Sequence, residues 1–215
     1  MITRFWLGTR RPGTSRAAFS QHWYRTHGPY GLALPGLRAY VQNHLVADPS
    51  PLTPPVFDGC SELDFDDVAA MRAAFASPEI EAADRDERAF ADPDRFGVVV
   101  TERQVLFGGS APDTPARLLC FVLANPRHTR AELADAVHDV AADQARRGDA
   151  VRAELLVAVE EAPEPQACDV VVSLWFPTLP ALMAAAPNWA AVSTETLTGL
   201  AFEREIALVR PRRLR

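Results

Sequence analysis

The spacing of hydrophobic positions changes repeatedly along the chain, and each change marks an expected element. Apolar runs and two-residue alternation predict strands, whereas apolar residues three and four apart predict helices. Gly28 and Pro29 are expected to end the first helix, and the charged stretch 77–96 is expected to be a surface excursion. In the first half the expected strands cover 2–8, 37–44, 57–65 and 98–107, and the expected helices cover 15–27 and 68–75.

The second half repeats this order with strands at 117–124, 151–159, 169–176 and 200–209 and helices at 129–147 and 177–186. Each half therefore reads βαββαβ, the ferredoxin-like arrangement. One face of each sheet stays apolar and uncovered, so the two sheets are expected to pack against each other. The sequence predicts an α+β fold in which tandem ferredoxin-like repeats, 1–109 and 117–215, form one barrel within the chain. A stretch with two prolines, 110–116, which follows Gly108 and Gly109, is the expected linker.

Composition narrows the class of protein. The chain has 215 residues, 48% of them hydrophobic, and a net charge of −6, values that are ordinary for a folded globular protein. The mild acidity argues against nucleic-acid binding. No apolar run is long enough for a transmembrane helix, and the first residues lack the pattern of a signal peptide. We therefore expect a cytoplasmic protein without nucleic-acid or membrane partners.

Several kinds of chemistry lack the residues they require. Cys60, Cys120 and Cys168 are widely spaced in apolar runs, which indicates neither a disulfide framework nor a zinc ribbon. The 22 basic residues are all arginine, so lysine Schiff-base chemistry is excluded. HExxH, Walker A and GxGxxG motifs are missing from the sequence. We expect neither a metal nor a cofactor.

Two histidines lie on the first expected helix. His27 falls at its C-terminal end, where the helix dipole stabilises an imidazolium, so it is a candidate general acid. The alternative is a capping residue that packs on Trp23. His22 points elsewhere, about 140° around the helix, and either binds substrate or packs as an ordinary surface or core residue.

Tyr40, Gln42 and His44 share one face of the second expected strand. The sheet face that packs against helices is expected to be apolar. This polar row is therefore expected on the opposite face, where it would line a cavity between the two sheets. There it could bind a carbonyl or phenol group and transfer a proton. The alternative is a hydrogen-bonded polar row at a strand end. A haem role would need a histidine at the cavity, for which His44 and His27 are the candidates.

Two charged residues add to the candidate site. Glu62, if it points into the barrel, could act as a base with a raised pKa, although such alternation is often solvent-facing. Arg38 could clamp a carboxylate of the substrate. The acidic stretch 79–94 reads as a solvated loop that could also gate the cavity.

Three motifs resemble one known family. Residues 19–29, FSQHWYRTHGP, are similar to the helix motif of EthD-like proteins, and residues 35–44, PGLRAYVQNH, look like the second motif of that family. Residues 58–65 and 70–79 resemble its third strand and second helix. The resemblance covers about 1–108 and implies the dimeric α/β-barrel superfamily. The second half lacks these motifs and resembles only a diverged copy, so the two halves are expected to pair within the chain or the protein is expected to form a homodimer.

The resemblance also suggests a function. The superfamily includes cofactor-free monooxygenases of polyphenols, haem-dependent enzymes, muconolactone-type isomerases and stress proteins, and EthD-like relatives in polyketide pathways are assigned dehydration or decarboxylation. We expect a cofactor-independent enzyme that dehydrates, decarboxylates or cyclises a small hydrophobic carbonyl- or phenol-bearing compound of aromatic polyketide metabolism. The alternatives are a cofactor-free monooxygenase of phenols and a non-catalytic ligand-binding or stress-response barrel. His44 and His27 are the expected catalytic residues, and the expected substrate-binding residues are Tyr40, Gln42, Arg38, Glu62, His22 and Trp23.

Overall fold

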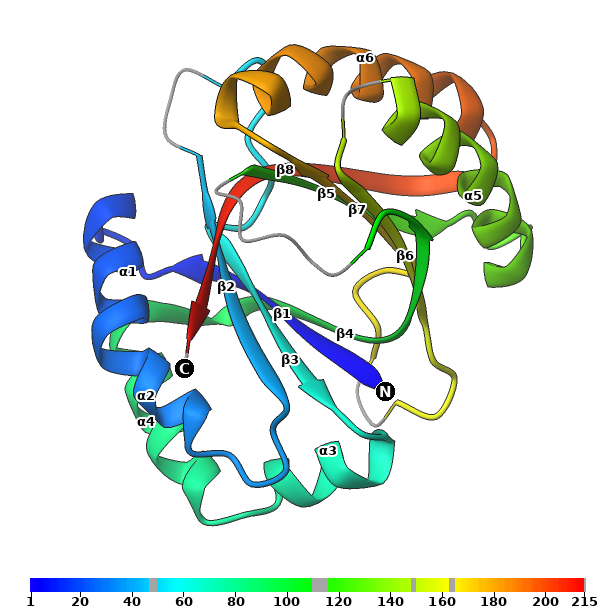
Figure 1. Cartoon of the computed structure of the whole chain (residues 1–215). Coiled ribbons are helices and arrows are strands. Elements are labelled where there is room, and N and C mark those ends of the chain that lie inside the picture. The colour runs from blue at the N-terminus through cyan, green and yellow to red at the C-terminus, as the bar shows by residue number, and fades with distance from the viewer. Residues whose placement is uncertain (47–49, 110–115, 148–149, 163–164, 215) are drawn as a thin grey trace.

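The strands of both halves close into one barrel. A computed structural model describes residues 1–46, 50–109, 116–147, 150–162 and 165–214. These residues form eight strands, every neighbouring pair antiparallel, in the closed order β1-β3-β2-β8-β5-β7-β6-β4 (Figure 1). The strands are β1 (Ile2–Arg10), β2 (Ala39–Leu45), β3 (Gly59–Phe65), β4 (Ala91–Phe107), β5 (Ala116–Ala124), β6 (Arg152–Ala158), β7 (Val170–Phe176) and β8 (Ala201–Leu214).

Each half contributes one ferredoxin-like sheet. The order within the first sheet is β4-β1-β3-β2, and the order within the second is β8-β5-β7-β6. The β2–β8 and β4–β6 pairs join the two sheets. The predicted barrel of tandem repeats within one chain is thus confirmed. Of the expected linker, residues 110–115 lie outside the described residues, and Ala116 already opens β5.

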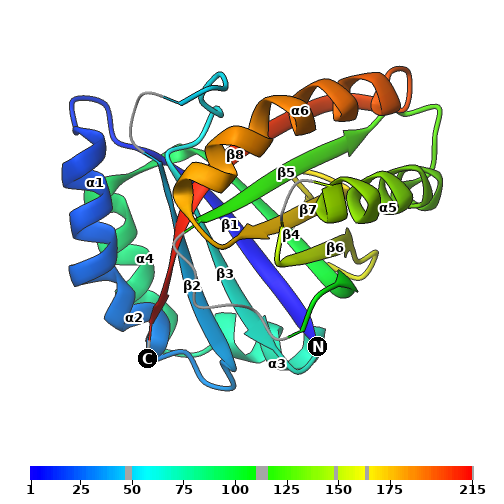
Figure 2. The same cartoon turned by 45° about the horizontal axis from the view of Figure 1, so that its top comes forward.

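The helices lie outside the barrel in two groups. Figures 1 and 2 show α1, α2 and α4 together against the first sheet and α5 and α6 together against the second. None of the helices that the structure describes has both the length and the apolar composition needed to cross a membrane. The helices are α1 (Arg16–His22), the π-helix η1 (Trp23–His27), α2 (Gly28–Leu32), α3 (Val68–Phe75), α4 (Glu79–Phe90), α5 (Arg130–Arg147) and α6 (Leu179–Leu197).

Side chains alternate between the barrel interior and the helical layer, as strand geometry requires. In β1, Phe5 faces inward and joins Val99 of β4 with Leu119 and Leu156 of the second half in one apolar cluster. Trp6 faces outward and packs with the residues of η1 and α4. The expected packing of the two sheets against each other is therefore realised as a shared barrel interior.

A layer of buried charges crosses that interior. Arg117, only 1% exposed, forms a two-pronged ion pair with Glu62 and lies 3.4 Å from Glu154 through Nη2. Arg103 reaches Glu62 and Asp64 at 3.2 and 3.3 Å. Burial opposes the ionisation of Glu154, but Arg117 and Arg103 outweigh it and lower its pKa to about 2. The layer links the first-half carboxylates to second-half arginine.

One expected helix boundary in the first half is wrong, and one helix there was not expected. The first helix does not stop at Gly28 and Pro29 but passes through η1 into α2, because Pro29 lies in the first turn of α2, where its missing N–H is tolerated. The expected surface excursion contains α4, whose Ala83 and Phe90 are buried against the molecule. Through Phe90 this helix packs against Phe19 and His22 of α1 and His27 of η1.

One expected boundary in the second half is also wrong. The last helix was expected to end near residue 186, but α6 extends to Leu197 and contains Pro187. Packing of Trp189 and Leu197 against the sheet holds the helix beyond this proline.

Candidate active site

The main cavity of the first half lies between its sheet and its helices. Its volume is about 730 Å³, and its walls come from the outward-facing residues of the sheet, η1, α2, α3 and α4. The expectation that the polar row of β2 would line a cavity between the two sheets is therefore wrong, because this row faces the helices and the middle of the barrel is filled by the apolar cluster and the layer of charges. The lining residues that matter for chemistry are Arg4, Trp6, Trp23, His27, Tyr40 and Glu87.

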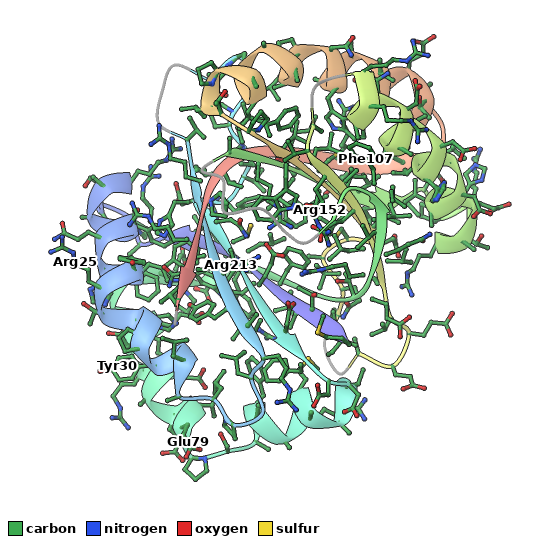
Figure 3. All side chains as sticks on the ribbon, viewed as in Figure 1. Arg25, Tyr30, Glu79, Phe107, Arg152 and Arg213 are labelled. Atoms are coloured by element: carbon green, nitrogen blue, oxygen red, sulfur yellow. The ribbon has the colours of Figure 1, made fainter. Side chains whose placement is uncertain are left out.

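The π-helix places Trp23 and His27 on the side that faces the sheet. Both residues are buried, whereas Arg25 and Tyr30 lie on the exposed side of the same helical run (Figure 3). The Trp23 ring lies over Gly59 of β3, where a Cβ atom would come within 2.6 Å of the ring. A local π-turn is a frequent feature of functional sites, and here it presents an aromatic ring and an imidazole to one cavity.

Asp86 of α4 binds both histidines of the first helical run. His27 Nδ1 lies 3.0 Å from Asp86 Oδ2, and His22 Nε2 lies 3.0 Å from Asp86 Oδ1. An ionised carboxylate only accepts hydrogen bonds, so Nδ1 of His27 carries the proton and Nε2 carries the lone pair. Burial lowers the pKa of His27 although the hydrogen bond to Asp86 opposes the shift. The site therefore holds His27 as a neutral imidazole.

Glu87 was not expected from the sequence and lies on the same cavity. Its carboxylate accepts a hydrogen bond from Trp6 Nε1 at 3.2 Å. Burial and, secondarily, the nearby Asp84 raise the pKa of Glu87. The helical stripe Ile80, Ala83, Glu87 and Phe90 was the available signal, because it places one carboxyl group on an otherwise apolar face.

Tyr40 lines the cavity from β2. Its hydroxyl oxygen accepts a hydrogen bond from Gln42 Nε2 at 3.0 Å, and the same amide donates to the Trp23 carbonyl at 2.9 Å. Burial raises the pKa of Tyr40 to about 12, against the opposing effect of Gln42. Tyr40 is therefore a neutral phenol that can donate a hydrogen bond, and Gln42 positions it.

His44 does not belong to the lining of this cavity. Its Nδ1 lies 2.7 Å from Ser20 Oγ, its Nε2 lies 3.2 Å from Gln42 Oε1, and its ring centre lies 4.8 Å from that of Trp23. Burial lowers the pKa of His44 to about 3. The expected orientation of the Tyr40, Gln42 and His44 row toward the barrel interior is wrong. The row faces the helices, which supply hydrogen-bond partners such as Ser20 Oγ and the Trp23 carbonyl. Since both ring nitrogens are engaged, His44 is poorly placed to ligate a haem iron.

Two further candidate residues lie outside the cavity. Glu62 points into the barrel, where it is bonded to Arg117, Arg103 and Asn43. Arg38 is exposed and pairs with Asp66 on the surface. The structure thus brings together the candidates of the helical run and of β2, with His44 against Trp23 and Gln42 but outside the cavity lining. It separates Glu62 and Arg38 from them.

The second half has a smaller cavity of about 330 Å³ between α5, α6 and β7, and the described residues that line it include no imidazole or carboxylate. Leu133 and Val137 of α5 and Leu182 and Trp189 of α6 pack in the layer between these helices and their strands. Within the described ranges, no group of three or more His, Cys, Asp or Glu side chains is arranged to hold a metal ion. The candidate chemistry is therefore concentrated in the first half.

The fold and site place the chain among the ferredoxin-like α/β barrels that form by pairing two sheets. Residues 11–94 match the EthD domain, which confirms the resemblance of the first half to EthD-like proteins. A comparison with curated protein sequences gave no match.

Solved structures share the architecture at low sequence identity. An anthrone oxidase-like protein is 8% identical with a TM-score of 0.72, covering 99% of this chain and 92% of its own. A chlorite dismutase variant from Candidatus Nitrospira defluvii is 7% identical with a TM-score of 0.52, covering 97% of this chain and 90% of its own. An EthD family protein from Bacillus halodurans C-125 is 25% identical with a TM-score of 0.40, covering 47% of this chain and 98% of its own. The first two establish the whole-chain fold.

Proposed function

We propose that this protein is an enzyme that moves protons on a small hydrophobic carbonyl- or phenol-bearing compound bound between the first sheet and α4. The observation that carries the proposal is the pair of ionisable groups on one cavity, His27 held by Asp86 and Glu87 held by Trp6. Their surroundings shift the two pKa values in opposite directions, which is the usual arrangement of a base and an acid.

His27 is the proposed base. Asp86 fixes the tautomer in which Nε2 carries the lone pair, and burial keeps the ring neutral. A neutral imidazole can remove a proton from a phenol or from a carbon next to a carbonyl group. The Asp86 carboxylate then stabilises the imidazolium that forms. His22, on the other oxygen of Asp86, holds this carboxylate in position.

Glu87 and Tyr40 are the proposed donors. The raised pKa of Glu87 keeps more of this carboxyl protonated than an exposed glutamic acid would be, so it can return a proton to a leaving hydroxyl or to a carbanion. The neutral Tyr40 phenol can donate to a carbonyl oxygen of the substrate. Such proton transfers assist the C–O cleavage of a dehydration, supply the proton that replaces carbon dioxide in a decarboxylation, and form the carbanion that attacks a carbonyl group in a cyclisation. This favours a lyase or cyclase.

A second candidate function is oxygenation without a cofactor. Removal of a phenolic proton by His27 would leave an electron-rich anion against the aromatic wall formed by Trp6 and Trp23, whose ring centres lie 5.8 Å apart. Such an anion can itself reduce oxygen. The fold shared with an anthrone oxidase-like protein is consistent with this candidate.

The masses of the reaction products, formed with and without air, test the proposal. A panel of phenolic polyketides is incubated with the wild type, His27→Ala, Glu87→Gln and the exposed control His138→Ala. We expect loss of water or carbon dioxide in both atmospheres, reduced in the first two variants and unchanged in the control. Oxygen gain only in air would favour the monooxygenase. Ligand retention without a change of mass would leave a binding protein.

A further inference from the structure

A second cavity opens at one end of the barrel and has no part in the chemistry above. Its volume is about 400 Å³. Leu7, Phe57 and Phe121 of the barrel interior form its floor, and the two phenylalanine rings meet edge to face at 5.4 Å. Cys168 also faces this cavity, and burial raises the pKa of its thiol, which therefore stays neutral. The floor suits a hydrocarbon.

Two of the four charged residues that line this cavity make polar contacts outside it. Glu205 accepts a hydrogen bond from the backbone N–H of Val56 at 3.3 Å. The Arg204 guanidinium donates to Ser193 and Thr194 of α6. The cavity therefore combines an apolar floor with charged residues at its opening, of which Glu205 and Arg204 are held by these contacts.

The two cavities meet at the edge of β4. Phe96, Gly97 and Ala167 line both of them. β4 pairs with β6 only from Thr101 onward, and nearer this end the Ala167 N–H donates to the Val98 carbonyl at 2.7 Å. Phe96 lies just beyond this contact and is 56% exposed. The outer-face cavity and the barrel-end cavity therefore adjoin at this edge of the strand.

We propose that the substrate carries an unbranched hydrocarbon arm that passes Phe96 and lies in the barrel-end cavity, while its phenol or carbonyl head lies between His27 and Glu87. This inference rests on the proposed function, because it takes the head group to bind in the first cavity. The barrel-end cavity then determines specificity for the arm, and the residues around the head perform the proton transfers.

Calorimetric binding of a homologous series tests the inference. The probes are 4-methyl-, 4-propyl-, 4-pentyl- and 4-heptylphenol. We expect affinity to rise with each methylene that enters the apolar floor, by about fourfold per methylene at full burial. Leu123→Trp, which fills the barrel-end cavity, should abolish the gain of the longer homologues and leave 4-methylphenol unchanged. Val105→Trp, on an exposed residue outside both cavities, is the matched control.

Thr9→Phe provides a second filling variant at the half-exposed rim, should Leu123→Trp fail to fold. Equal affinities from propyl to heptyl, or an undiminished heptyl gain in a folded filling variant, would overturn the inference. Failure of 4-methylphenol to bind, or binding that Trp23→Ala leaves unchanged, would instead count against the first cavity as the site of the head group. The two failures are therefore distinguishable.

Discussion

At the scale of single residues, burial sets the chemistry of the site more than charge does. The pKa of His27 is lowered and that of Glu87 is raised, and burial is the largest cause in both cases. Each shift favours the uncharged form of its group. The sequence indicated His27 through its motif, but it could not reveal the partner Asp86, which is 59 residues away. Such partners depend on the tertiary packing of α4.

The pH dependence of turnover follows from these two groups. kcat/KM should rise with pH as His27 loses its proton, at a pKa below the ordinary 6.5, and fall as Glu87 loses its proton, at a pKa above the ordinary 4.5. Glu87→Gln should lower the rate and remove the falling limb. Measurement of kcat/KM from pH 4 to 9 checks this. A falling limb that persists in a folded Glu87→Gln variant would assign the acid to another group.

His44 gives a prediction about stability. Its pKa is about 3 in the folded protein against an ordinary 6.5, so the unfolded chain binds the proton more tightly. The folding stability due to the neutral ring is complete above pH 6.5 and is lost as the pH falls toward 3. Between pH 7 and 5 the wild type should lose about 2 kcal/mol more than His44→Gln. Urea denaturation at both pH values measures this difference, and equal losses would contradict it.

At the scale of elements, short and regular segments were predictable, whereas segments that depend on tertiary contact were not. The helix at 68–75 was predicted and is confirmed as α3, whose Asp67 cap accepts from the Ala70 N–H. The helix α4 was missed because its many charges conceal a narrow buried stripe. The continuation through η1 was missed because Gly28 and Pro29 are typical helix ends, and only the packing of this run against the sheet reverses that preference.

The packing of the Trp23 ring against β3 can be tested by a substitution at Gly59. A Cβ atom there would lie 2.6 Å from the ring, so Gly59→Ala must displace Trp23 or the strand. We expect a loss of about 1–3 kcal/mol in the free energy of unfolding and weaker binding of phenols. Gly109→Ala is the matched control, because nothing lies within 4 Å of the added atom. Chemical denaturation compares the two variants, and equal stabilities would argue against this packing.

At the scale of the whole molecule, the closed barrel makes one unit of two repeats that differ in sequence, since the EthD match covers residues 11–94. The repeated βαββαβ order was readable from hydrophobic periodicity, and so was the pairing of the two sheets. The location of the cavity could not be predicted from the sequence. The alternation of side chains along β2 and β3 shows which residues share a face, but it does not show which face points into the barrel. The arginine layer decides this question, since Glu62 finds Arg117 only inside the barrel.

The barrel charges predict how the halves depend on each other. Arg117→Met removes one of the two cations that pair with both buried carboxylates, Glu62 and Glu154, and leaves Arg103 as the other. Such a loss should destabilise the fold by about 3–5 kcal/mol, and both halves should unfold in one transition. Arg147→Met, in a surface pair with Asp143, should change stability by less than about 1 kcal/mol. Guanidinium denaturation measures both variants. Equal losses in the free energy of unfolding would contradict the claim that the buried charges hold the two halves together.

The most direct test of the central claim is a crystal structure of the protein with a phenolic compound that it turns over. We predict ligand density between the first sheet and α4, with a ligand oxygen or acidic carbon within hydrogen-bonding reach of His27 Nε2 and the carboxyl group of Glu87. Density confined to the barrel interior beside Glu62, or at the helices of the second half, would contradict the assignment of the active site to this cavity.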